Sequence, residues 1–376
     1  MKNIALCLLL AGIGCKVATP ESPPAKPQYQ SEKITVPAAH AKEPVRKDFS
    51  LELADDYLEK GAVAWTRKRG CVTCHTTGTY MQVRPALTSI MGEPTPEIHE
   101  LLIDELAELK QAETAELRKS TKPAQVIYIA AGLAEWDRHV KGQLSGETRS
   151  ALKVMFEIQE NDGTWGSLGC WPPLESSAYQ EATIAAMAVE AAPGWREGLE
   201  DEKLKQGVVS LHNYLRKTKP PHDYARVLLL WTATKVEGLL TEERREELAN
   251  VLWSHQLENG GWSLRTFAAP DQWGDGNRAA KLRAEKEFLS PSSDGHMTGL
   301  AVLVLREAGV PAEDPRLQKA VKWLLANQRE SGRWWTRSLN TDKYHYITYS
   351  GTAYPLLALA KCGVLTSKLA PKPKTE

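Results

Sequence analysis

Five consecutive residues near the start of the chain, Cys71-Val72-Thr73-Cys74-His75, have the spacing at which haem c is attached to proteins. Each thiol can form a thioether with one haem vinyl group, and the imidazole that follows can bind the iron as its proximal ligand. The pattern therefore predicts covalent haem c on Cys71 and Cys74, with His75 on the metal. Electron transfer or haem-based sensing is the function that this cofactor favours.

Zinc binding or a redox cysteine pair would use the same residue types. A structural zinc site needs a second ligand pair at similar spacing, whereas the other cysteines, Cys7, Cys15, Cys170 and Cys362, are scattered singly. Haem is thus the preferred interpretation, and zinc or a disulfide remains the alternative. Cys170 and Cys362 could form a disulfide of their own, although the sequence cannot place them together.

The two ends of the chain differ in composition from its middle. Residues 1–15 contain one lysine, a short apolar run and small residues before Cys15, a pattern typical of a signal peptide. We expect export to the periplasm or cell envelope, with a lipid on Cys15 as the one membrane attachment and plain secretion as the alternative. Residues 16–48, rich in Pro, Ala and Lys, predict a flexible tether, and residues 366–376 predict a flexible tail.

The charges of the chain balance, because lysine plus arginine and aspartate plus glutamate number 47 each. Without a basic excess, electrostatic binding of nucleic acid is not expected. No stretch after the first fifteen residues is long and apolar enough for a membrane helix. The expected partners are a redox partner protein or a small apolar ligand.

A second pattern, Gln-x-x-x-Gly-x-Trp, occurs three times, at 159–165, 256–262 and 328–334. A segment with helical apolar spacing precedes each copy and another follows it. This recurring unit of two helices joined by a turn predicts a helical repeat array over 49–365. Counting units gives six pairs, with outer helices at 51–69, 97–119, 147–159, 200–217, 242–256 and 314–328, and inner helices within 81–91 and at 123–139, 177–191, 222–236, 295–308 and 346–361.

At these residues the chain resembles the squalene cyclase and protein prenyltransferase superfamily, whose repeats carry this motif and close into an (α/α)6 toroid. The resemblance covers roughly 51–365 and implies an all-α (α/α)6 toroid of inner and outer helices. In the motif, Gln can cap an outer helix, Gly permits the turn and Trp packs over the joint. These residues are therefore expected to hold the fold and to do no chemistry.

The haem motif occupies the place of one of these turns. The segment 62–65 aligns by pattern with 320–323, and RGCVTCH then stands where the later repeat has QRESGRW. Every such turn leads from the end of an outer helix to the start of an inner one, so the motif and the starts of the inner helices should share one rim. Candidates for the second axial iron ligand are His222, His296, His345, Met91 and His99.

An alternative metal site lies in the later repeats. Asp294-Gly295-His296, and the Asp-x-Tyr-His stretch that ends at His345, look like the positions at which the protein farnesyltransferase β subunit carries its catalytic zinc ligands. This resemblance implies zinc at Asp294, His296 and His345, and with it a toroid enzyme of the cyclase or prenyltransferase type. Helix capping by Asp294 is the competing explanation.

The fold alone does not determine the activity. The clustered Asp-x-Asp-Asp motif of squalene–hopene-type cyclases is absent, and no pair of carboxylates can be assigned roles. A non-catalytic binding scaffold therefore stays open as a third function. Residues 263–290 interrupt the repeats, and we interpret them as a lid or partner-binding loop, or as a solvated surface helix.

Overall fold

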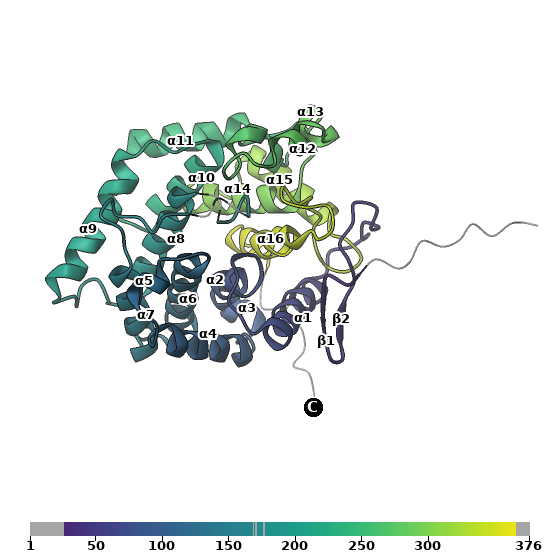
Figure 1. The fold of residues 1–376 in the computed structure, drawn as a ribbon. Helices are drawn as coiled ribbons and strands as arrows, with labels where there is room; N and C mark the ends of the chain where they lie inside the picture. Colours follow the sequence, from purple (N-terminus) through teal and green to yellow (C-terminus); the bar gives the residue numbers. More distant parts are fainter. Residues whose placement is uncertain (1–25, 168, 170, 176, 366–376) are drawn as a thin grey trace, which may run out of the picture.

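The computed structural model describes residues 26–167, 169, 171–175 and 177–365. The predicted signal peptide with Cys15, the disulfide candidate Cys170 and the predicted tail at 366–376 lie outside them. Within the described part the chain is almost entirely helical, and its helices follow one another around a ring (Figure 1). The predicted all-α toroid is confirmed.

Outer helices form the circumference of the ring. They are α1 (Leu51–Arg69), α4 (Pro96–Leu109), α7 (Gly146–Glu157), α9 (Glu202–Lys217), α11 (Glu242–Ser254) and α15 (Pro315–Ala326). These helices bury one stripe each; in α15, Leu317 and the residues three, four and seven positions later are buried. That spacing is the apolar face of an amphipathic helix, so the outer layer covers the inner one and turns its polar face to solvent.

Inner elements line the axis of the ring. They are α2 (Thr79–Val83), α6 (Lys122–Trp136), α8 (Ala178–Ala191), α10 (Asp223–Ala233), α14 (Gly295–Glu307) and α16 (Ser350–Lys361). Neighbouring inner helices contact one another in that order, and α16 contacts α2, so the inner layer closes on itself. Covered on all sides, these helices are apolar nearly throughout; in α14 every residue from Gly295 to Leu305 is buried.

Short elements complete the connections. They are α3 (Thr88–Met91), α5 (Thr114–Leu117), α12 (Ala279–Arg283), α13 (Lys286–Leu289), the π-helical turns η1 (Cys74–Gly78) and η3 (Asp137–Lys141), and the 3₁₀ turns η2 (Pro85–Leu87), η4 (Leu264–Thr266), η5 (Pro270–Gln272) and η6 (Tyr346–Thr348). Among the described residues, no helix combines the length and the apolar character needed to cross a membrane.

The last Gln/Trp turn closes the ring between α15 and α1. Gln328 Nε2 donates to the carbonyl oxygens of Gly332 and Ser50, both at 2.8 Å. The Ser50 N–H donates back to Gln328 Oε1 at 2.7 Å. Trp334 Nε1 donates to Leu324 O at 2.8 Å, near the end of α15, where the Asn327 N–H donates to the same carbonyl at 3.3 Å. One amide side chain therefore joins the last outer helix to the first.

The two earlier Gln/Trp turns repeat these bonds. Gln159 donates to the backbone of its own turn and to Gly207 of α9, both at 3.0 Å. Gln256 does the same within its turn and to Arg316 of α15, at 2.8 and 3.0 Å. We predicted that Gln would cap its own helix. Instead Trp caps that helix and Gln binds the next one, because the turn brings the Gln amide beside the neighbouring helix.

Glycine is required at the closest approach in each turn. Gly332 has a φ of 87°, in the left-handed region that side chains disfavour. A Cβ built there would lie 2.3 Å from the carbonyl carbon and oxygen of Leu53 in α1. Gly163 and Gly260 have the same φ region, and a Cβ there would lie 2.6 Å from Ser210 O and 2.8 Å from Lys319 C, respectively. The motif thus sets how closely consecutive outer helices approach.

Residues 26–48 differ from the predicted flexible tether. Strands β1 (Tyr29–Ser31) and β2 (Ile34–Val36) form an antiparallel hairpin beside α1. Further along, Glu43 accepts a hydrogen bond from Arg333 Nε at 2.8 Å, and both side chains are buried. The composition suggested a tether because the partners of these anchors lie about three hundred positions away in the sequence. We call residues 26–48 the N-terminal strap.

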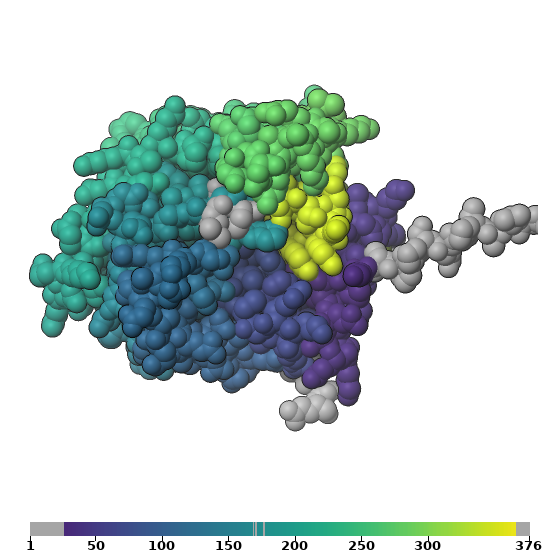
Figure 2. All heavy atoms as spheres, viewed as in Figure 1, coloured from purple at the N-terminus to yellow at the C-terminus, as the bar shows by residue number. Residues whose placement is uncertain are grey.

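The predicted insertion at 263–290 folds against the ring. The expected surface helix is broken into α12 and α13 at Glu285, whose carboxylate lies 2.7 Å from Arg265 with both side chains 3% exposed. Trp273 is fully buried. Figure 2 shows the insertion, in green, against the C-terminal segment in yellow, so this part of the chain covers one rim of the toroid.

Replacing the glycine at ring closure tests how far the fold depends on this contact. Gly332→Ala should lower the free energy of unfolding by about 1–3 kcal/mol more than Gly309→Ala, because overpacking adds to backbone strain. Gly309 has a φ of 93° and open space around it, so Gly309→Ala measures the cost of backbone strain without any overpacking. Urea unfolding followed by circular dichroism measures both; equal losses would mean that the close contact does not matter.

Candidate functional site at one rim of the toroid

The predicted haem-attachment motif at 71–75 lies at the joint between α1 and α2, where the alignment of repeats placed it. α1 ends at Gly70, which has a left-handed φ of 55° and whose N–H caps the last turn. The chain then enters the turn η1 at Cys74. A Cβ at Gly78, the end of that turn, would lie 2.7 Å from a ring carbon of Tyr128, so the motif is held against α6.

Cys74 and His75 line one pocket at this rim, with a volume of about 380 Å³ including its open mouth. Cys74 is 2% exposed and His75 is half-buried. The other lining residues are Trp171, Pro172, Pro173, Leu174, Ser338, Asn340, Thr341, Tyr344, Tyr346 and Ile347. The walls are largely apolar, and the volume is near the lower end for small-molecule sites.

The imidazole of His75 is held on three sides. Its Nδ1 lies 2.8 Å from Thr76 Oγ1, and the Tyr29 hydroxyl lies 3.1 Å from the same oxygen. Its ring stacks on Tyr346, with centroids 4.8 Å apart and planes at 13°, and meets the edge of Trp65 at 4.9 Å. Tyr29 belongs to the N-terminal strap, so the strap helps to orient this histidine.

Burial keeps the His75 ring neutral. Desolvation lowers the pKa of His75 to about 4, so the imidazole carries no charge at neutral pH. In the tautomer that donates from Nδ1 to Thr76 Oγ1, Nε2 carries the lone pair that a metal ligand needs. Fixing the tautomer through the other ring nitrogen is the usual support for a metal-binding histidine.

Of the three residues predicted to hold haem, Cys71 is the one that does not line this pocket. Its side chain is half-buried, burial raises the pKa of its thiol, and its carbonyl accepts from Trp65 Nε1 at 3.2 Å. The structure therefore brings Cys74 and His75 together at one apolar surface and leaves Cys71 beside it. Cys74 and His75 thus present at one surface a thiol and an imidazole, which are the two donor types that haem c requires.

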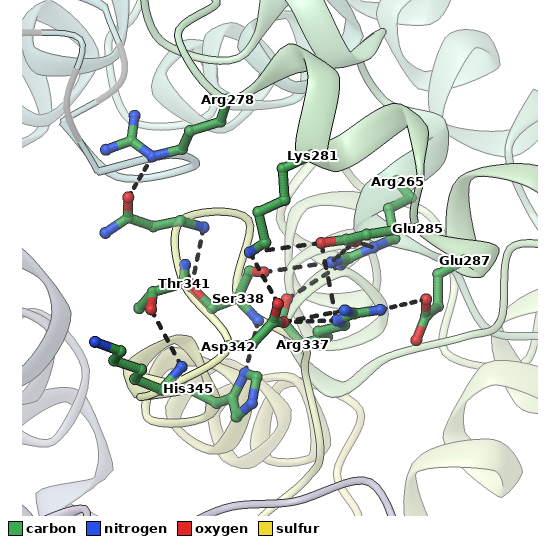
Figure 3. A network of polar contacts seen from close by, with 12 residues as sticks. Arg265, Arg278, Lys281, Glu285, Glu287, Arg337, Ser338, Thr341, Asp342 and His345 are labelled. Carbon is green, nitrogen blue, oxygen red and sulfur yellow. Dashed lines mark hydrogen bonds and ion pairs between the residues drawn. The ribbon is translucent and has the colours of Figure 1, made fainter.

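Polar contacts from the insertion hold one wall of the pocket (Figure 3). Arg337 donates to Glu287 of the insertion at 2.6 Å and to Asp342 at 3.0 Å. Lys281, also in the insertion, lies 3.3 Å from Asp342. Tyr344 follows two positions later and stacks on the ring that covers His75. The insertion thus positions the aromatic wall of the pocket.

His296, a candidate second axial ligand, is used inside the ring instead. It is fully buried, with Nε2 3.0 Å from the Tyr224 hydroxyl and Nδ1 2.8 Å from Ser350 Oγ. Burial lowers the pKa of His296 to about 3, so it is a neutral hydrogen-bonding group. These contacts leave neither ring nitrogen available to a haem at the rim.

The other four candidates also lie outside the lining of the pocket. His222 caps the start of α10, His345 accepts a backbone N–H, His99 stacks on Trp136 of α6, and Met91 is buried at the end of α3. The structure therefore gives no support to a second axial ligand from this set. A shared rim was too coarse a criterion, because it does not determine which way a side chain points.

The predicted zinc set is not brought together. Asp294 accepts from the N–H groups of Met297 at 2.9 Å and Leu264 at 2.7 Å, which is the capping role that competed with zinc. His296 and His345 are committed to the contacts above. Among the described residues, no group of three or more His, Cys, Asp or Glu side chains is placed to hold a metal ion.

A pair of carboxylates that the sequence did not reveal lies in a second crevice of this rim. Glu175 and Glu181 line it with Glu160, Arg118 and others, in a volume of about 740 Å³ including the open mouth. Glu181 is 2% exposed, and burial together with the Glu175 carboxylate raises the pKa of Glu181 well above its usual value. In the sequence Glu181 looks like an ordinary acidic residue in the first turn of a capped helix, so no signal distinguished it.

Comparison with known proteins confirms the fold and leaves the family open. No model of a known protein family matches the chain. A stretch of 121 residues is 34% identical to part of a terpene cyclase-glycosyl transferase fusion protein from Humicola fuscoatra. The match covers 30% of this chain and 7% of that protein, so the chain spans only a small part of its relative.

Solved structures of the same architecture include two glycosidase structures. A wild-type glycosidase and a glycosidase variant in complex with glucose have TM-scores of 0.52 and 0.53, each at 10% identity over 84% of this chain and 97% of theirs. The type II terpene cyclase MstE from Scytonema has a TM-score of 0.44 at 12% identity, over 83% of this chain and 100% of that one. At such identities the glycosidases establish a shared toroid and nothing about activity.

Removing the hydroxyl beside His75 should change its tautomer. Thr76→Val leaves Nδ1 without its partner and should shift the imidazole toward the Nε2–H form, whereas Thr76→Ser should keep the native balance. Loss of this buried bond should also cost about 1 kcal/mol of stability. The ¹⁵N shifts of the His75 ring in haem-free protein report the tautomer; native shifts in Thr76→Val would show that the hydroxyl does not set it.

Proposed function

We propose that this chain is an exported toroid enzyme whose reaction centre is the pocket beside Cys74 and His75, with haem c held there. The observation that carries the proposal is that a buried thiol and a neutral, hydrogen-bonded imidazole line the same apolar pocket. The proposal of an enzyme depends on this pocket alone, because the toroid shared with glycosidases says nothing about activity. Export to the periplasm or cell envelope, with or without a lipid on Cys15, follows from the signal-like residues 1–15.

Each residue has a defined part in this proposal. Cys71 and Cys74 would each hold haem c through a thioether to one vinyl group, an addition that needs no oxidant, and His75 Nε2 would be the group that binds the iron. When bound, haem c supplies one-electron transfer or ligand binding at its iron. Thr76 holds the His75 proton on Nδ1. Tyr344 and Tyr346, which form the aromatic wall of the pocket, keep water from that side.

The pocket also indicates a substrate or partner class. Trp171, Leu174 and Ile347 present apolar surface beside the reaction centre, which suits a small apolar organic molecule. Trp171 is 45% exposed and lies at the mouth, where a redox partner protein could contact it. Both partners belong to the proposal.

Haem attachment is tested by covalent staining. The full chain, expressed with haem-attachment machinery, should keep its haem on a denaturing gel, and a variant with both Cys71→Ser and Cys74→Ser should lose it. Cys362→Ser, a cysteine far from the motif in sequence, should stain like the native protein. His75→Ala should retain stain but change the absorption spectrum of the iron. A native protein without covalent haem would exclude this function.

A second candidate function is acid–base hydrolysis at the crevice lined by Glu175 and Glu181. Glycoside hydrolases use a carboxylic acid that stays protonated together with a second carboxylate. Glu181 has the raised pKa that such an acid needs, and burial is the largest cause. This candidate needs no haem, so the two functions predict different effects of the same variants.

Glu181→Gln separates a catalytic from a structural role. If the crevice hydrolyses chromogenic glucosides, this variant should lose at least about a hundredfold in kcat, as expected for a lost general acid. The pKa of Glu181 is raised in the folded state, so the free energy of unfolding of the native protein should fall as the pH rises above about 4.5. The Glu181→Gln variant should not show this fall, because the amide does not ionise. Native hydrolysis that survives Glu181→Gln would exclude the acid role.

A further inference from the structure

A separate cavity opens at the opposite rim, where the inner helices end. Its volume is about 780 Å³ including the mouth, within the usual range for ligand pockets. Residues from all six inner elements line it, namely α2, α6, α8, α10, α14 and α16, together with Ala86 of η2 and residues that follow α6 and α10. It therefore lies on the axis of the ring and shares no lining residue with the pocket beside Cys74.

The inner wall of this axial pocket is apolar. Ala131 of α6, Ile184 and Met187 of α8, Trp231 of α10 and Leu357 of α16 face one another across it. A solvent-open surface of this kind, supplied by four inner helices, can bury the body of an apolar molecule.

The mouth carries fixed positive charge. Glu307, 8% exposed, lies 2.7 Å from Lys235 Nζ and 3.3 Å from Lys361 Nζ, and also accepts from Trp231 Nε1 at 2.8 Å. The two lysines hold the pKa of Glu307 below its usual value, so the carboxylate is charged. Each ammonium group has three donors, and Glu307 takes one from each. The remaining donors are available at the mouth.

A guanidinium group faces these lysines from another helix. Arg138 Nη1 donates to the Glu190 carbonyl at 3.2 Å, and its other N–H groups make no described bond. Apart from His139, the lining residues bear three cations against two carboxylates, namely Arg138, Lys235 and Lys361 against Glu135 and Glu307. These three cations could serve only to stabilise the C-termini of the inner helices, because positive charge is favourable there. That role would not explain why an apolar cavity lies behind them.

Buried aromatic residues separate the axial pocket from the other rim. Tyr354 meets Trp231 edge to face with centroids 5.9 Å apart, and lies 5.2 Å from the ring of His296. Tyr354 and His296 are 2% and 0% exposed. A ligand in the axial pocket would therefore contact neither Cys74 nor His75.

We propose that the axial pocket binds an amphiphile with an apolar body and a single anionic head. The body lies against Trp231 and the α8 residues, and the head binds the free donors of Arg138, Lys235 and Lys361. A carboxylate and a phosphate monoester share this chemistry, and a guanidinium fork can bind either one through two parallel bonds.

Calorimetric titration of the full chain with four ten-carbon probes tests the ligand class. Decanoate and decyl phosphate should bind saturably, and the tighter of the two identifies the head. Decanol should bind at least about tenfold more weakly, because charge-assisted hydrogen bonds are lost. Decyltrimethylammonium should bind no better than decanol. Equal affinity for all four would overturn the anionic head.

Two variants locate the binding. Lys235→Gln should weaken decanoate about fivefold to tenfold through the head, and Met187→Trp, at a partly exposed position, should fill the body of the pocket and abolish binding. Lys205→Gln, an ion-paired lysine exposed on α9, is the matched control and should bind like the native protein. If Met187→Trp does not fold, Lys235→Gln still tests the site.

The outcome is independent of the haem proposal. Lys235→Gln leaves Cys71, Cys74 and His75 untouched, so covalent haem staining should be unchanged even where decanoate binding falls. Saturable binding that none of the pocket variants alters, or no saturable binding at all, would overturn the axial site. A chain that lacks haem but binds decanoate would retain this inference and lose the other.

Discussion

One side-chain amide closes the ring, and both rims depend on that closure. Gln328 binds its own turn and the backbone of Ser50 at once, so the last repeat is joined to the first. The bonds have this geometry because Gly332 lets two backbones approach to a distance that no side chain allows. Repeats need such neighbours, since a single helix pair cannot bury its own apolar face. Every pocket described above is a consequence of the closed inner layer.

The N-terminal strap connects that closure to the chemistry of the rim. Arg333 lies within the closing turn and binds Glu43 of the strap, while Tyr29 from the same strap reaches the hydroxyl that holds His75. The buried ion pair fixes the position of the strap more than it adds stability, because desolvation offsets much of its attraction. Ring closure and the orientation of the histidine are therefore linked through one short segment.

Local patterns predicted the helices well and the site only in part. The first outer helix, predicted at 51–69, is observed at Leu51–Arg69, because the signals that define a helix lie within or next to it in the sequence. The strap was missed because the partners of the Glu43 carboxylate, Ser331 and Arg333, lie 288 and 290 positions away in the sequence. The pair of Glu175 and Glu181 was missed for the same reason, since burial that raises a pKa is created by packing and leaves no mark at the residue.

The centre of the toroid explains how one ring can carry two unrelated pockets. Tyr224, His296 and Ser350 form a hydrogen-bonded chain across the axis, and all three are buried. With their polar atoms paired to one another, these side chains fill the axis at little cost in desolvation. The toroid is consequently a solid ring with a concave surface at each end, in place of an open channel. Each end can then vary its own lining without disturbing the other, which is the physical reason that a shared toroid says so little about activity.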